Sequence, residues 1–81
     1  MIYQRLADDI LEYTCERYKA LGVDVTPEMI KGKSRGKGIM KVRRTAAHLL
    51  HGTELLGLTD IGRVMCRDHG TINNMLHGAG W

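Results

Sequence analysis

Basic and polar side chains that could bind nucleic acid occur in two short stretches of the 81-residue chain. The first runs from Lys33 to Arg44, and the second runs from Arg67 to Asn74. Residues 29–53, which contain the first stretch, carry seven Lys and Arg residues and no Asp or Glu. Charges of one sign repel one another, so an unmixed positive segment is typical of a protein that binds a polyanion. The plainer alternative is a solvated, lysine-rich face.

The second stretch combines hydrogen-bond donors and acceptors at the expected start of a helix. Free backbone N–H groups and the positive end of the helix dipole suit a phosphate at such a position. The side chains of Asp68, His69 and Thr71 can reach base edges in a major groove about 12 Å wide. The glycine-rich loop around Arg35 is slender enough for a minor groove, whose negative potential attracts arginine. Together the two stretches predict binding to double-stranded DNA.

Other chemistry is poorly supported. A phosphate-binding loop at Gly32-Lys33-Ser34 would need glycine five residues before the Gly-Lys pair, where Pro27 stands. Cys66, His69 and His77 are fewer than the four ligands of a closed zinc site, and no third group orients a Cys–His nucleophile. We therefore expect no enzymatic activity, no metal, no nucleotide and no other cofactor. We expect Cys66 to be a buried, apolar thiol.

The hydrophobic pattern of the N-terminal half predicts two helices and a loop. Apolar residues recur at three- and four-residue steps from Tyr3 to Ala20, which indicates one long helix. Thr26 and Pro27 are typical of a helix start and predict a second, short helix. Three glycines then interrupt residues 31–38, so we expect a flexible basic loop there.

The C-terminal half predicts three more helices. Apolar residues share one face over 39–52, and a fourth, short helix is expected with Thr59 as its N-cap. Asp68 is a suitable N-cap for a fifth helix, which ends at residues 78–80. Two short helices joined by a tight turn form a helix-turn-helix. The predicted fold class is all-α, a small bundle of about five helices that contains a helix-turn-helix.

Length and composition limit the class of protein. We expect one domain over residues 1–81, because a chain of this size can bury only one small core. No apolar run approaches the roughly 20 residues of a membrane span, and two cysteines are too few for a disulfide-rich secreted protein. These observations predict a cytoplasmic protein with no membrane partner.

Four segments, in this order, resemble the C-terminal DNA-binding domain of the bacterial replication initiator DnaA, a Trp-repressor-like helix-turn-helix. They are Met29–Arg35, Val42–Leu49, Leu58–Gly62 and Arg67–Thr71. The resemblance covers about residues 8–77 and implies binding to duplex DNA in a bacterial cytoplasm, by a host or a phage protein. We expect a stand-alone domain, because the ATPase domain of the family has no counterpart in this chain.

The resemblance also implies roles for individual residues. Arg35 matches an arginine that enters the minor groove, and Arg43 and Arg44 match two residues that contact the backbone and a base edge. Asp68 and His69 match residues that contact base edges in the major groove. The match extends to Thr71 and to His51, which corresponds to a basic residue near phosphate.

Three features depart from the family pattern, and one of them is the expected recognition helix, which is shorter because the chain ends soon after His77. Gly70 replaces a threonine whose methyl group can contact a thymine methyl, so a base contact that discriminates sequence is missing. Cys66 stands where the family usually has glycine, and the turn before Arg67 is one residue shorter. These departures bear on which DNA sequence is preferred.

The leading hypothesis is a non-enzymatic DNA-binding protein that regulates replication initiation or transcription, in competition with the initiator at its sites. The candidate DNA-binding residues are Lys33, Ser34, Arg35, Lys37, Lys41, Arg43, Arg44, His51, Arg67, Asp68, His69, Gly70, Thr71 and Asn74. One alternative is a protein-interaction module that binds the initiator or another replication protein through the acidic outer face of the first helix. Another is a binder of structured RNA. The sequence leaves open the preferred site, the oligomeric state and the role of Trp81.

Overall fold

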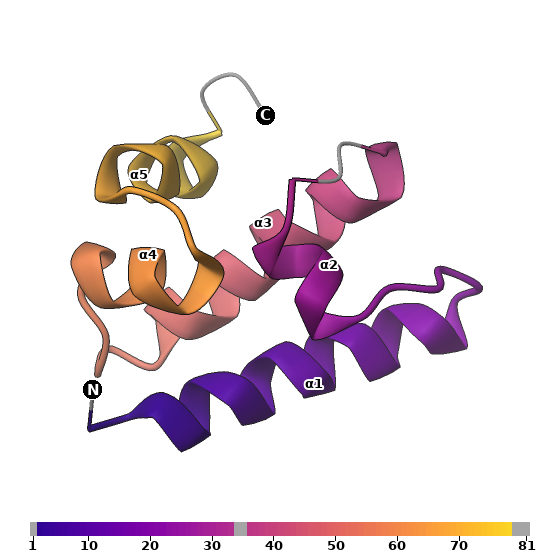
Figure 1. Ribbon diagram of the computed structural model, residues 1–81, viewed down its shortest axis with the longest axis horizontal. Coiled ribbons are helices and arrows are strands. Elements are labelled where there is room, and N and C mark those ends of the chain that lie inside the picture. Colours follow the sequence, from indigo (N-terminus) through magenta and orange to yellow (C-terminus); the bar gives the residue numbers. More distant parts are fainter. Residues whose placement is uncertain (1, 34–35, 79–81) are drawn as a thin grey trace.

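The computed structural model describes residues 2–33 and 36–78, which form five helices and no strand (Figure 1). The all-α prediction is therefore confirmed for the described part of the chain. The helices are α1 (Gln4–Ala20), α2 (Pro27–Lys31), α3 (Lys37–Gly52), α4 (Leu58–Met65) and α5 (His69–His77).

The end of the first helix and the start of the second agree with the sequence prediction. Gly22, with a φ of 89°, follows the end of α1, and this left-handed conformation is readily adopted only by glycine. The Thr26 hydroxyl accepts a hydrogen bond from the backbone N–H of Met29 at 3.3 Å, and Pro27 occupies the first turn of α2. Both features satisfy or remove N–H groups that have no partner inside the helix.

Two predicted boundaries are wrong. The third helix begins at Lys37 rather than Ile39, because Gly36 serves as its N-cap and accepts the N–H of Met40 at 3.1 Å. The basic loop is therefore shorter than residues 31–38. Gly57, not Thr59, precedes α4 as its N-cap, and its carbonyl accepts the N–H of Ile61 at 3.0 Å. Thr59 instead lies within the first turn of α4.

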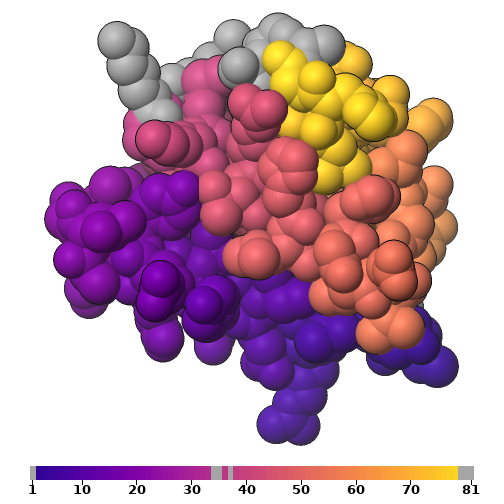
Figure 2. Space-filling view, turned by 180° about the vertical axis from the view of Figure 1, so that it is seen from behind, coloured from indigo at the N-terminus to yellow at the C-terminus, as the bar shows by residue number. Residues whose placement is uncertain are grey.

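All five helices contribute to one core. Seen from behind, α3 crosses the molecule between α1 and α5 (Figure 2), and α4 packs against α5. The fully buried apolar side chains include Ala7, Leu11, Ile30, Val42, Ala46, Leu50, Ile61, Met65, Ile72 and Met75. Burial of this apolar surface is the main favourable contribution to folding, and it holds the helix-turn-helix rigidly on α3.

Candidate nucleic-acid interface

The turn between α4 and α5 is built on a close approach of two backbone segments. The N–H of Arg67 donates to the carbonyl of Gly62 at 2.8 Å. A Cβ atom on Gly62 would lie 2.4 Å from the Arg67 carbonyl oxygen, so only glycine fits there. Cys66, which ends α4, has a left-handed φ of 56° and is exposed. The predicted buried thiol is therefore wrong, because Cys66 lies in the turn after α4 rather than on the packed face of a helix.

The start of α5 presents a set of polar groups to solvent. Asp68 is the N-cap, and both Asp68 and His69 are exposed. The half-buried Thr71 hydroxyl donates to Asp68 Oδ1 at 2.5 Å. This hydrogen bond lowers the pKa of the Asp68 carboxyl, so the group is a carboxylate at neutral pH. An acceptor and an imidazole therefore stand together at the helix start.

The exposed face of α5 also includes a residue absent from the predicted set. Asn73 and Asn74 are exposed, whereas Ile72 and Met75 are buried against the core. Asn73 lies four residues after His69 and so on the same face of the helix. Helical spacing alone could have identified Asn73. Its amide, like that of Asn74, can donate to and accept from a base edge.

Arg43 is buried, with 2% of its surface exposed. Its Nε donates to the Ile30 carbonyl, and its Nη2 donates to the carbonyls of Met29 and Gly32, all at 2.9 Å. The last carbonyls of a helix have no partner within it and form the negative end of the dipole. Arg43 satisfies them at the end of α2, a contact inside the protein that differs from the predicted contact with DNA.

Arg67 is half-buried and binds the same end of α2. Its Nη1 donates to the carbonyls of Met65 at 2.6 Å and Ile30 at 3.0 Å. Its Nη2 donates to the Gly32 carbonyl at 2.5 Å. Burial lowers the pKa of this guanidinium. The predicted DNA contact by Arg67 thus competes with three hydrogen bonds to backbone inside the protein.

The remaining basic residues of the predicted set occupy different places. Lys33 is exposed directly after Gly32, and Lys41 is exposed on α3. His51 is also exposed on α3, ten residues after Lys41, which corresponds to about 15 Å along a helix. Arg44 is half-buried. It lies beside the C-terminal end of α5, where its Nη2 would be 2.8 Å from a Cβ atom placed on Gly78.

Three predicted residues cannot be placed completely. Ser34 and Arg35 lie outside the described residues, as does Trp81. The backbone of Lys37 opens α3, but its side chain is outside the described part. Gly70, the remaining member of the set, is half-buried in the first turn of α5. A Cβ atom on Gly70 would lie 3.1 Å from Asp68 Oδ2.

The two polar stretches of the sequence meet in space. Arg67, in the helix-turn-helix, contacts Gly32, from which the basic loop departs, although 35 residues separate them. Asp68 and His69 follow Arg67 directly in the chain. The start of the basic loop and the start of α5 therefore lie on one side of the molecule, with the exposed Lys33 beside them.

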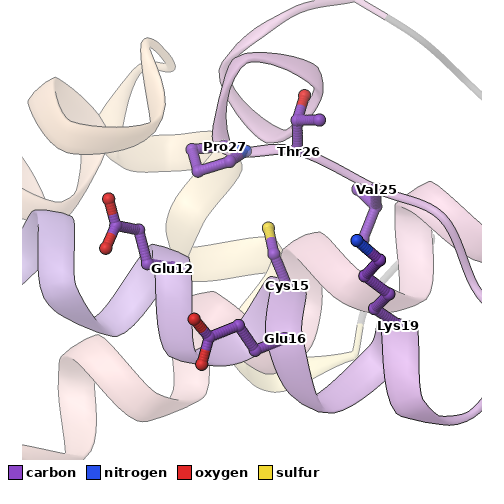
Figure 3. A pocket seen from close by; sticks show the side chains of 7 residues that line it. All are labelled: Glu12, Cys15, Glu16, Lys19, Val25, Thr26 and Pro27. Atoms are coloured by element: carbon purple, nitrogen blue, oxygen red, sulfur yellow. The ribbon is translucent and has the colours of Figure 1, made fainter.

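A groove of about 200 Å³ lies elsewhere, between α1 and the segment that leads into α2 (Figure 3). The sulfur of Cys15 points toward Thr26 and Pro27, and the carboxylates of Glu12 and Glu16 lie on the α1 side. Burial raises the pKa of the Cys15 thiol, and the neighbouring Glu28 and Glu12 raise it further. A protonated thiol is a poor nucleophile and a poor metal ligand.

Residues 2–33 and 36–78 contain no group of three or more His, Cys, Asp or Glu side chains arranged to hold a metal ion. No helix among them is long and apolar enough to cross a membrane.

The comparison with known proteins agrees with the helix-turn-helix geometry. No curated protein and no solved structure matches the chain. The profile of a protein family, described as the bacterial dnaA protein helix-turn-helix, matches residues 7–77. This match spans most of α1 and all of α2 to α5, and the helix-turn-helix of this family is a DNA-binding domain. The chain therefore belongs to the bacterial DnaA helix-turn-helix family.

Proposed function

We propose that this domain binds double-stranded DNA selectively, with the start of α5 in the major groove and the basic loop in the adjacent minor groove. The observation that carries the proposal is the contact between Arg67 and Gly32, because it brings the two elements to one side of the molecule. In a helix-turn-helix, the N-terminal residues of the second helix contact base edges. Asp68, His69, Asn73 and Asn74 have exposed side chains that are available for that contact.

Asp68 favours selectivity over affinity. A carboxylate near the DNA backbone is repelled by phosphate, and a cytosine or adenine amino group can offset that repulsion by donating a hydrogen bond. The Thr71 hydroxyl already donates to Asp68 Oδ1, which fixes the orientation of the carboxylate. Asp68→Asn should therefore bind random duplex more tightly and discriminate less between sequences. Unchanged selectivity in this variant would contradict a role in base contact.

Phosphate binding is assigned to a smaller set of cations than the sequence suggests. Arg43 and Arg67 donate to backbone carbonyls. The candidates that remain are Lys33, Arg35, Lys37, Lys41 and Arg44. If four or five of them neutralise one phosphate each, a plot of log affinity against log salt concentration has a slope of about −3.6 to −4.5. Seven contacts would give a slope of about −6.

The experiment begins with selection of bound fragments from a random duplex pool, followed by salt-titrated binding to the selected and the random duplex. His69→Ala should weaken binding to the selected site by about 1–3 kcal/mol and flatten the base preference. Tyr13→Ala is the control, because Tyr13 is exposed on α1, which contributes no residue to the proposed surface. Equal loss on every duplex would remove His69 from the base-reading role.

The biological role proposed for this activity is regulation of replication initiation or transcription by occupation of DNA sites. In this scheme the domain competes with a replication initiator for those sites. Absence of measurable affinity for any duplex at 50 mM salt would refute DNA binding, and would favour instead an interaction with a replication protein. Tighter binding to a matched RNA duplex than to DNA would favour structured RNA.

A further inference from the structure

We propose that Arg67 is a positioning residue for DNA binding. Arg43 and Arg67 together form what we call the arginine pair. The arginine pair fixes the start of the basic loop against the helix-turn-helix. The inference rests on the proposed function, because the loop and α5 must engage one duplex at the same time. It assigns to Arg67 a task inside the protein in place of a contact with phosphate.

The two guanidinium groups share their acceptors. Both donate to the carbonyls of Ile30 and Gly32 at the end of α2. Two like charges would ordinarily repel one another at such close quarters. The carbonyl oxygens at the end of a helix carry partial negative charge, which offsets that repulsion. This arrangement orders the backbone at Gly32, where α2 ends and the basic loop begins.

The arginine pair connects two elements that are far apart in the chain. Arg43 comes from α3, which follows the loop, and Arg67 comes from the turn that precedes α5. Arg67 also donates to the Met65 carbonyl within its own turn. The start of the loop is thus tied by one side chain to the residue directly before Asp68. When Gly32 and Lys33 are ordered before binding, they lose less conformational freedom on the DNA, so the complex is more stable.

Charge-conserving replacement separates positioning from phosphate binding. Arg67→Lys keeps the positive charge but loses the planar fork that reaches three carbonyls in three directions. Arg67→Gln removes the charge as well. If Arg67 positions the loop, the lysine and glutamine variants should both bind the selected duplex about 10-fold more weakly. Both should keep the wild-type salt slope, because the number of neutralised phosphates is unchanged. Arg17→Lys, at an exposed arginine of α1, is the matched control and should bind like wild type.

A second measurement uses the DNA-free protein, so it does not depend on the proposed function. The NMR order parameters of the Gly32 and Lys33 amides should fall in both Arg67 variants, from about 0.85, typical of rigid backbone, toward 0.6. The amides of α1 should keep their values, which shows that the fold is intact. All DNA measurements are made at a temperature where each variant is folded by circular dichroism, so that a loss of stability alone leaves the affinity unchanged.

Three results would overturn the proposal. The first is wild-type affinity in Arg67→Lys with a salt slope about 0.9 shallower in Arg67→Gln, which would make Arg67 a phosphate contact. The second is unchanged order parameters at Gly32 and Lys33 in both variants. The third is a normal affinity for DNA in both variants although Gly32 and Lys33 have become mobile. Absence of DNA binding by the wild-type protein would instead refute the proposed function, and the order parameters would still report on the arginine pair.

Discussion

Gly62→Ala should destabilise the domain although it replaces glycine by the best helix-forming residue. Gly62 lies inside α4, where alanine would ordinarily stabilise the protein by about 0.8–1 kcal/mol. The new Cβ atom would lie 2.4 Å from the Arg67 carbonyl oxygen, and real Cβ atoms essentially never come closer than 3.0 Å to such an atom. The helix and the turn must therefore separate by about 0.6 Å, the difference between these distances.

The expected magnitude follows from three contributions. Overpacking against a rigid backbone costs about 1–3 kcal/mol. Separation also weakens the hydrogen bond between the Arg67 N–H and the Gly62 carbonyl, now 2.8 Å, which costs up to about 1 kcal/mol. Subtraction of the helix-propensity gain leaves a net loss in the free energy of unfolding of up to about 3 kcal/mol. For a domain of this length, a loss of that size lowers the Tm by up to about 20 °C.

Thermal unfolding followed by circular dichroism measures this difference, and urea unfolding checks the sign at constant temperature. The control is Gly52→Ala, at the last residue of α3, where no atom lies within 4 Å of the new Cβ. This variant should be as stable as wild type or more stable by up to about 1 kcal/mol. A Gly62→Ala variant with a Tm at or above that of wild type would refute the close approach between α4 and the turn.

Three further perturbations test the turn, the helix start and the arginine pair. Cys66→Gly should raise the free energy of unfolding by up to about 1 kcal/mol, because glycine adopts the left-handed φ of 56° without side-chain strain; a lower urea midpoint would contradict this. The lowered pKa of Asp68 means that its charged form stabilises the fold above about pH 4 and that this contribution is lost as the pH falls through the folded-state pKa. In Thr71→Val, an NMR titration should show a higher pKa for Asp68, and an unchanged pKa would show that the hydroxyl is not its cause. Arg43→Met should lower the free energy of unfolding by about 2–3 kcal/mol, whereas Lys41→Met, exposed on the same helix, should stay within about 0.5 kcal/mol of wild type.

The helices were predictable because their signals are local. The apolar spacing of α1, the Thr26-Pro27 start of α2 and the N-cap position of Asp68 each lie within one turn of the element they define. The start of α3 was not predictable from glycine content. Gly38 lies within α3, and a Cβ placed on it would be 3.5 Å from the Val23 side chain. Packing against the rest of the chain therefore outweighs the low helix propensity of glycine there.

The role of Arg43 could not be read from the sequence, because it depends on a tertiary contact. A helical pattern shows that Arg43 lies at the border of the apolar face of α3, but not what that border faces. The carbonyls at the end of α2 require donors, and only the packing of α2 on α3 brings Arg43 to them. For Cys66 a signal was present, since the family usually has glycine at that position, and glycine is typical of a left-handed turn.

Binding of two arginines inside the fold changes how the charge of the chain should be interpreted. Residues 29–53 carry seven Lys and Arg residues, but Arg43 is buried, and Arg67, from outside that segment, donates to the same carbonyls. In the proposed mode of binding, these two groups order backbone and contact no phosphate, so only the other cations meet the DNA. The electrostatic contribution to DNA affinity is therefore expected to be modest. A larger share of any preference among DNA sites must then come from the uncharged and acidic groups at the start of α5. Salt should then weaken binding to random and selected duplexes by the same factor, and a preference for the selected site that persists at high salt is the result this reasoning requires.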